Sequence, residues 1–95
     1  APDIPTILLV RVPEHSSEPE RAALWMANKA EQIGASGIGI RHNWHTPELM
    51  AIAAQRGLAI FVWTVDKKVD MRTFIHAGVH GIITNRPQDL QSLLQ

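Results

Sequence analysis

Short apolar runs alternate along the chain with longer stretches in which apolar and polar residues mix at helical spacing. The runs are rich in branched side chains, which is typical of strands that other elements cover. Each run is followed by a stretch with one apolar face, which is typical of an amphipathic helix. The four expected strands are Ile7–Val10, Gly37–Ile40, Ala59–Val65 and Gly81–Thr84.

Polar residues and glycines mark the expected ends of the helices. Before each helix stands a side chain whose oxygen can accept a hydrogen bond from a first-turn amide. The expected N-caps are Ser17, in a capping box with Glu20, then Thr46, followed by Pro47, then Asp66 and Asn85. The first three helices are expected to stop at Gly34, Gly57 and Gly78.

The spacing of these units predicts an α/β fold with a parallel four-stranded sheet. Strands begin at Gly37, Ala59 and Gly81, about 22 residues apart, which leaves room for one crossover helix between parallel neighbours. The 95 residues make one domain, residues 1–95. Its (βα)4 arrangement corresponds to half of a TIM barrel.

Half a barrel leaves one sheet face and two sheet edges without a partner. Alternation along the third strand points Ile60 and Val62 toward the helices and Phe61 and Trp63 toward the barrel axis. By the same parity, Arg41 is expected to reach the mouth of the barrel beside Trp63. Two copies related by a twofold axis would join four strands to four and close an eight-stranded barrel. We therefore predict a homodimer closed to (βα)8.

Composition argues against several classes of function. Nine basic side chains balance nine acidic ones, so nothing favours binding to nucleic acid or to an anionic membrane surface. The chain has no cysteine, which excludes thiolate chemistry. The longest apolar run, Leu58–Val65, is far too short to span a bilayer, and the first residues lack the features of a signal peptide. A cytoplasmic location and no membrane span are the expectation.

Two motifs carry a family resemblance. Residues 62–65 read Val-Trp-Thr-Val, and residues 78–87 read Gly-Val-His-Gly-Ile-Ile-Thr-Asn-Arg-Pro, with a helix start at Thr46–Leu49. Together they resemble the C-terminal half of the glycerophosphodiester phosphodiesterase family. The resemblance implies strands five to eight of a TIM barrel, phosphodiester hydrolysis as the family activity, and a divalent cation. It also implies that Trp63 forms an aromatic wall beside the glycerol or phosphate.

The chain departs from the family pattern in ways that bear on catalysis. Asp66 stands where the family usually has asparagine, and His80 and Asn85 stand where it usually has aspartates. The family's His-Arg motif, its metal-binding carboxylates and its acid/base histidine belong to the N-terminal half of the barrel. None of these roles passes to a residue of this chain by motif.

The loops after the strands hold the candidate chemistry, because a barrel places its active site at the C-terminal ends of its strands. Arginines at these positions are suited to bind a phosphate bidentately. The candidate phosphate-binding residues are Arg11, Arg41, Trp63 and Arg86.

Two histidines and two carboxylates are the other candidates. His42 and His45, three residues apart on a loop, suggest acid/base or metal chemistry, although two exposed loop histidines explain the same spacing. Glu14 and Asp66 are the carboxylates placed to hold a Mg²⁺ or Ca²⁺ ion, and the alternative for Asp66 is the helix cap. 

Three hypotheses for function follow. The first is a phosphodiesterase-like half barrel that dimerises and binds a phosphate-containing small molecule at its mouth, with weak metal-assisted phosphodiester hydrolysis. The second is a non-catalytic binding or assembly module. The third is a fragment that needs its missing N-terminal half in trans. Whether the chain is an enzyme stays open at this point.

Overall fold

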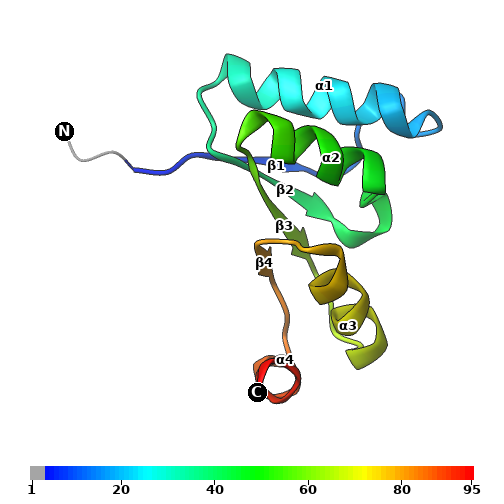
Figure 1. Ribbon diagram of the computed structural model, residues 1–95, viewed down its shortest axis with the longest axis vertical. Coiled ribbons are helices and arrows are strands. Elements are labelled where there is room, and N and C mark those ends of the chain that lie inside the picture. The colour runs from blue at the N-terminus through cyan, green and yellow to red at the C-terminus, as the bar shows by residue number, and fades with distance from the viewer. Residues whose placement is uncertain (1–3) are drawn as a thin grey trace.

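Strands and helices alternate strictly through residues 4–95, the part of the chain that the computed structural model describes. The elements are β1 (Ile7–Val10), α1 (Pro19–Gln32), β2 (Gly37–Arg41), a 3-10 turn η1 (His42–Trp44), α2 (Pro47–Arg56), β3 (Ala59–Trp63), α3 (Lys68–Ala77), β4 (Gly81–Ile82) and α4 (Pro87–Leu94). The sheet has the order β1-β2-β3-β4 with every pair parallel (Figure 1). The predicted (βα)4 arrangement is therefore confirmed.

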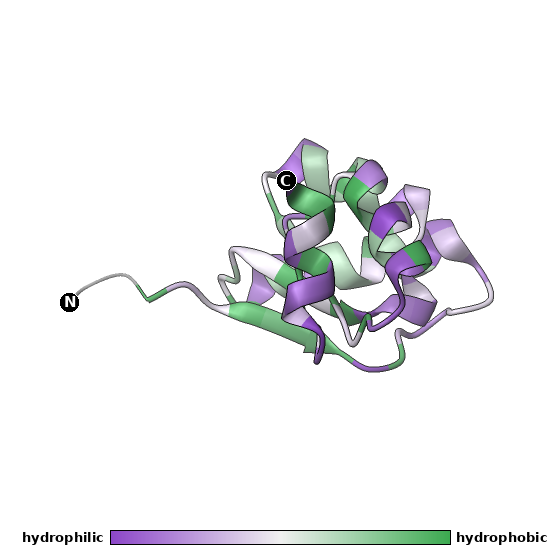
Figure 2. Cartoon of the chain, turned by 90° about the horizontal axis from the view of Figure 1, so that it is seen from below, coloured by the Kyte–Doolittle hydropathy of each residue, from purple (hydrophilic) through white to green (hydrophobic). Residues whose placement is uncertain are grey.

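The two faces of the sheet differ as the alternation predicts. Ile38, Ile40, Ile60 and Val62 are fully buried, and the helices lie to one side of the strands (Figure 2). The opposite face is open, and Leu9 on it keeps 68% of its surface exposed. Apolar burial of the first set drives the helices onto the sheet. The open face is the one that points to the axis in a barrel.

Glycine allows the side chains of the open face to meet across the sheet. A Cβ on Gly39 would lie 2.9 Å from Leu9 Cδ2 and 3.3 Å from Trp63 Cζ3. A Cβ on Gly81 would overlap the Phe61 ring. The small residues therefore let large neighbours on adjacent strands pack over them.

The observed helix ends agree with the predicted ones at some sites and differ from them at others. Thr46 Oγ1 accepts a hydrogen bond from the Leu49 amide at 3.1 Å, which confirms this N-cap. Gly57 and Gly78 are left-handed C-caps, as expected. Gly34 is also left-handed, but α1 already ends at Gln32.

The predicted capping box at Ser17 is wrong. The N-cap of α1 is Glu18, and it makes no side-chain cap bond. A turn precedes the helix instead, in which the Glu18 amide donates to the His15 carbonyl at 2.8 Å and His15 has a φ of 62°. This turn shifts the helix start one residue along the chain, to Pro19.

Asp66 and Asn85 are not helix caps either. Lys67 precedes α3 and Arg86 precedes α4, and neither position makes a side-chain cap bond. Asp66 and Asn85 bond to each other instead, across two neighbouring loops. Each of these side chains therefore bonds to a residue distant in sequence and not to the first turn of the helix that follows it.

Backbone pairing between β3 and β4 reaches further than the strand bounds. The Ile83 amide donates to the Val62 carbonyl at 2.8 Å, and the Val65 amide donates to the Ile83 carbonyl at 3.0 Å. Both expected strands, Ala59–Val65 and Gly81–Thr84, were longer than the observed ones, but their ends still pair. This pairing holds the loops after β3 and β4 side by side.

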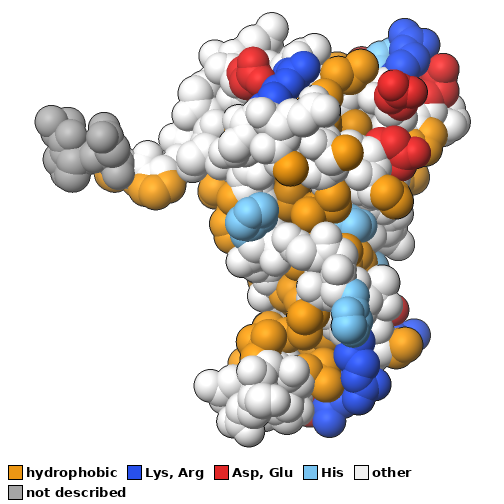
Figure 3. Space-filling model, viewed as in Figure 1, with side chains coloured by type: hydrophobic (Ala, Val, Ile, Leu, Met, Phe, Trp, Pro, Cys, Tyr) orange, Lys and Arg blue, Asp and Glu red, His pale blue; other side chains and the backbone are white. Residues whose placement is uncertain are grey.

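Surface composition agrees with the balanced charge of the chain. In the space-filling view, charged side chains lie toward the two ends of the visible face, whereas apolar side chains are spread over all of it (Figure 3). No helix within residues 4–95 combines the length and apolarity needed to cross a membrane.

Candidate anion-binding site

An open hollow of about 310 Å³ lies at the C-terminal ends of β1, β2 and β3. Its lining residues are Arg11, Arg41, His42, Trp63 and Thr64. The sheet register explains why they meet. Arg41 pairs with Trp63, and Arg11 directly follows Val10, which pairs with Ile40. Three of the four predicted phosphate-binding residues therefore converge on one place.

The hollow carries the positive charge of two arginines. Arg11 and Arg41 are exposed, and within residues 4–95 neither forms an ion pair. None of the described residues that line the hollow is a carboxylate. Two guanidinium groups with free donors are suited to bind an oxyanion such as phosphate.

Hydrogen bonding fixes the His42 ring beside the two arginines. Its Nδ1 lies 3.2 Å from the Trp63 carbonyl oxygen. A carbonyl oxygen only accepts hydrogen bonds, so Nδ1 carries the proton and Nε2 of the neutral ring is an acceptor. The ring also packs edge-on against Phe74, with 6.2 Å between centroids.

His45 has different surroundings from His42, although the sequence suggested them as a pair. It does not line the hollow. Its ring packs edge-on against Phe74 at 5.1 Å, and its Nε2 is buried without a hydrogen-bond partner. Burial lowers the pKa of His45, because the charged form loses solvation. A neutral packing residue fits these observations.

Asp66 is occupied by hydrogen bonds within the protein. Its carboxylate accepts from the Asn85 amide at 2.8 Å, from Thr84 Oγ1 at 3.0 Å and from Asn85 Nδ2 at 3.4 Å. These bonds, first of all the one from the Asn85 amide, lower the pKa of Asp66. The carboxylate thus ties the loop after β3 to the loop after β4.

The contact between Asp66 and Asn85 was not predicted from the sequence, although the sequence contains a signal for it. The family resemblance places asparagine at position 66 and aspartate at position 85. This chain has Asp66 and Asn85, so the two departures are reciprocal. Because the two residues are in contact, the exchange keeps one carboxylate and one amide at the junction.

The remaining predicted site residues lie outside the hollow. Arg86 Nε donates to Asp89 Oδ2 at 2.7 Å, and Arg86 is absent from the lining. Glu14 is exposed in the turn before α1. No group of three or more histidine, aspartate or glutamate side chains in residues 4–95 is arranged to hold a metal. With Asp66 already bonded to three donors, the described residues, 4–95, do not fit a metal site by themselves.

Removal of the Asp66 carboxylate is expected to loosen the loop after β4. In Asp66→Ala the Asn85 amide loses its acceptor, so its hydrogen exchange should become faster, as measured by NMR. Asp70→Ala, which removes a carboxylate from the first turn of α3, is the matched control and should leave Asn85 unchanged. 

The pH dependence of the same amide checks the cause. Because the folded pKa of Asp66 is depressed, the tie is present above the unfolded pKa of about 3.9 and is lost as pH falls through the lower folded value. The Asn85 amide shift should therefore change only below about pH 4. Equal hydrogen-exchange rates of the Asn85 amide in wild type and Asp66→Ala would show that the Asp66 carboxylate does not hold the loop after β4.

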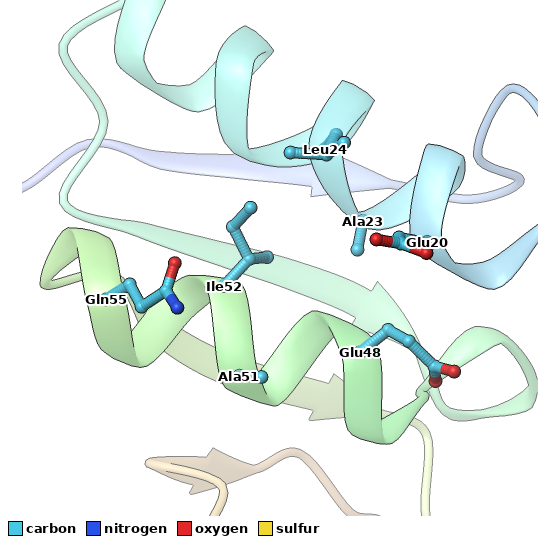
Figure 4. Close-up of a pocket in the computed structure, with 7 residues that line it drawn as sticks. All are labelled: Glu20, Ala23, Leu24, Glu48, Ala51, Ile52 and Gln55. Atoms are coloured by element: carbon cyan, nitrogen blue, oxygen red, sulfur yellow. The ribbon is translucent and has the colours of Figure 1, made fainter.

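A second hollow, of about 220 Å³, lies between α1 and α2 (Figure 4). Its lining is mainly apolar, with the side chains of Glu20 and Glu48 at one end of it. It contains no arginine, lysine or histidine. An anion would meet carboxylates there, so this hollow is not the anion site.

Comparison with known proteins agrees with the sequence motifs. Residues 1–89 match the glycerophosphoryl diester phosphodiesterase family. A glycerophosphodiester phosphodiesterase of Caldanaerobacter subterraneus is 47% identical over 49 residues, which cover 52% of this chain and 20% of that protein.

Solved structures show the same fold. A crystal structure from Silicibacter pomeroyi, assigned as a glycerophosphoryl diester phosphodiesterase, superimposes with a TM-score of 0.80 and 33% identity, over 99% of this chain and 32% of that one. A phosphodiesterase from Oleispira antarctica, in complex with the product sn-glycerol-3-phosphate, superimposes with a TM-score of 0.79 and 16% identity, over 98% of this chain and 34% of that one. The chain thus spans about a third or less of the length of these relatives.

Proposed function

The chain belongs to the glycerophosphoryl diester phosphodiesterase family, and on this premise we propose that it forms the phosphate-binding side of a phosphodiesterase-like barrel mouth. The observation that carries the proposal is the convergence of Arg11, Arg41 and Trp63 on one hollow that no carboxylate lines. Arginine forks bind phosphate oxygens, and the indole forms an apolar wall beside them.

The ligand class in this proposal is a small phosphate ester. Two exposed guanidinium groups select an oxyanion over a neutral ligand. The Oleispira antarctica relative holds sn-glycerol-3-phosphate, a ligand of this class. The hollow of about 310 Å³ has the size of a small-molecule site.

A second copy of the chain closes the barrel in this proposal. β1 and β4 are the two edges of the described sheet, and its open face carries Phe61, Trp63 and the exposed Leu9. Edge-to-edge pairing of two copies would cover all of these groups and place two hollows around one mouth. The alternative closing unit is a set of four N-terminal βα units, for which the greater length of the relatives leaves room.

Recognition, more than catalysis, is the role that we propose for this chain. Within residues 4–95 the side chains do not fit a metal site, and neither His42 nor His45 has a carboxylate among its hydrogen-bond partners there. The family resemblance assigns the metal-binding carboxylates and the acid/base histidine to the N-terminal half of the barrel. Hydrolysis would therefore need that half.

A turnover assay tests this division of roles. The chain alone, with a glycerophosphodiester and Mg²⁺ or Ca²⁺, is expected to give no turnover above background. Addition of the first four βα units of the Silicibacter pomeroyi relative should produce activity, and Arg41→Ala in this chain should lower it. Light scattering of the chain alone should report two copies per particle.

Two results would contradict the proposal. Turnover by the chain alone, lost in His42→Ala, would make it a catalytic half barrel. A monomer at micromolar concentration would remove the second copy as the closing unit and leave the N-terminal units.

A further inference from the structure

The unprotonated nitrogen of His42 is available to a ligand. Nδ1 is used by the Trp63 carbonyl, so Nε2 is the free acceptor of the neutral ring. Within residues 4–95, His45 Nε2 is the one buried side-chain nitrogen or oxygen without a partner, so His42 Nε2, which has no partner either, reaches solvent. His42 lines the same hollow as Arg11 and Arg41.

When the His42 ring is neutral, its Nε2 acceptor is unfavourable for an anion that Arg11 and Arg41 attract. A fully deprotonated oxyanion offers only acceptors, and the lone pair of neutral Nε2 would repel it. Protonation of Nε2 turns the acceptor into a third cationic donor, which attracts the same anion. The favourable protonation state of His42 therefore depends on whether the hollow is filled.

We propose that anion binding in the hollow and protonation of His42 at Nε2 are coupled, so that the site takes up a proton with its ligand. The proposal rests on the anion-binding function proposed for the hollow and adds its regulation by pH. His42 is a ligand-contacting residue in this scheme, with Nε2 donating to an anion oxygen while Nδ1 keeps its bond to Trp63.

The sign of the pH dependence follows from this linkage. The anion stabilises the protonated ring, so the anion and the proton each bind more tightly when the other is present. Affinity for the anion is then highest at low pH and falls as pH rises. Arg11 and Arg41, the other charged groups that line the hollow, keep their charge through this range.

The other titratable groups near His42 have distinct positions. His45 packs on the same Phe74 ring as His42, and the helix that carries Phe74, α3, also carries Asp70 in its first turn. Variants of these two residues separate their titration from that of His42.

The test uses sulfate, which stays a dianion through the titration range of histidine and so adds no proton of its own. Calorimetric titrations of the 95-residue chain at about pH 5.5 and about pH 7.5 bracket the ordinary histidine pKa of about 6.5. If the anion favours the protonated ring by about tenfold, the Kd is about fivefold weaker at the higher pH. Titrations in buffers of different ionisation enthalpy count the proton taken up.

The matched variant is His42→Asn, whose side-chain amide can still donate to the Trp63 carbonyl but has no group in the place of Nε2. It is expected to bind sulfate with the same Kd at both pH values. His45→Gln and Asp70→Asn should keep the wild-type pH dependence. Arg41→Gln should weaken binding at both pH values.

Each outcome has one meaning. A Kd that is independent of pH in wild type, or that keeps its pH dependence in His42→Asn, overturns the coupling but leaves anion binding intact. No sulfate binding at either pH, or binding that Arg41→Gln does not weaken, overturns the proposed function of the hollow and the coupling with it. Loss of the pH dependence in His42→Asn alone supports the proposal.

Discussion

Arg41→Ala is expected to weaken the binding of sn-glycerol 3-phosphate by about tenfold to a hundredfold, because a charge-assisted hydrogen bond contributes about 1.5–3 kcal/mol. Arg41 lies in register with Trp63 and has no ion-pair partner within residues 4–95, so its donors are free for the ligand. Isothermal titration calorimetry measures the change directly.

Two control variants show whether the effect belongs to the hollow. Arg86→Ala removes an arginine that is tied to Asp89 and lies outside the hollow, so it should change the Kd less than twofold, or about 0.4 kcal/mol. Arg41→Lys keeps the charge but loses the planar fork, so an intermediate affinity is expected. Equal losses of affinity in Arg41→Ala and Arg86→Ala would mean that the net charge of the chain, and not the position of Arg41 in the hollow, determines binding.

Ile60→Ala is expected to lower the free energy of unfolding by about 2–5 kcal/mol, because it leaves a cavity in the layer between sheet and helices. Ile60 is fully buried there. Domains of this kind are stable by only about 5–15 kcal/mol, so the loss is a large fraction of the total. Urea denaturation followed by circular dichroism measures it.

Phe61→Ala is the matched control, because Phe61 is the next residue and lies on the open face of the sheet. In a single copy it is partly exposed, so its truncation should cost less than the roughly 3–5 kcal/mol typical of a fully buried phenylalanine. If two copies close the barrel, this cost should rise with protein concentration, because association stabilises only the folded form. A larger loss in Phe61→Ala than in Ile60→Ala at low concentration would place the main core on the wrong face of the sheet.

Local sequence rules determined much of the fold. Strand parity placed Ile60 and Val62 under the helices and Trp63 on the open face, because successive side chains in a strand point to opposite sides. The same parity brought Arg41 to Trp63. Thr46 and Gly57 set the ends of α2 through bonds and dihedral angles that involve only nearby residues.

Rules of the same kind failed at two predicted helix caps, for different reasons. Ser17 and Asp66 both have the chemistry of an N-cap, yet neither caps a helix. A local backbone turn at His15–Glu18 takes the place of the first cap, whereas Asn85, which is remote in sequence, bonds to the Asp66 carboxylate. A short-range pattern carries no information about a remote partner such as Asn85.

By itself, then, the sequence determined the order of the strands, the sheet face that each strand side chain takes and the position of Arg41 beside Trp63, because these follow from periodicity along the chain. Only the tertiary structure decided the state of the polar groups at the mouth. His42 holds its tautomer through Trp63, burial against Phe74 lowers the pKa of His45, and the Asp66 carboxylate bonds to the loop after β4. In each case the deciding partner comes from another βα unit, and the energy of a hydrogen bond or of a desolvated charge depends on where that partner lies.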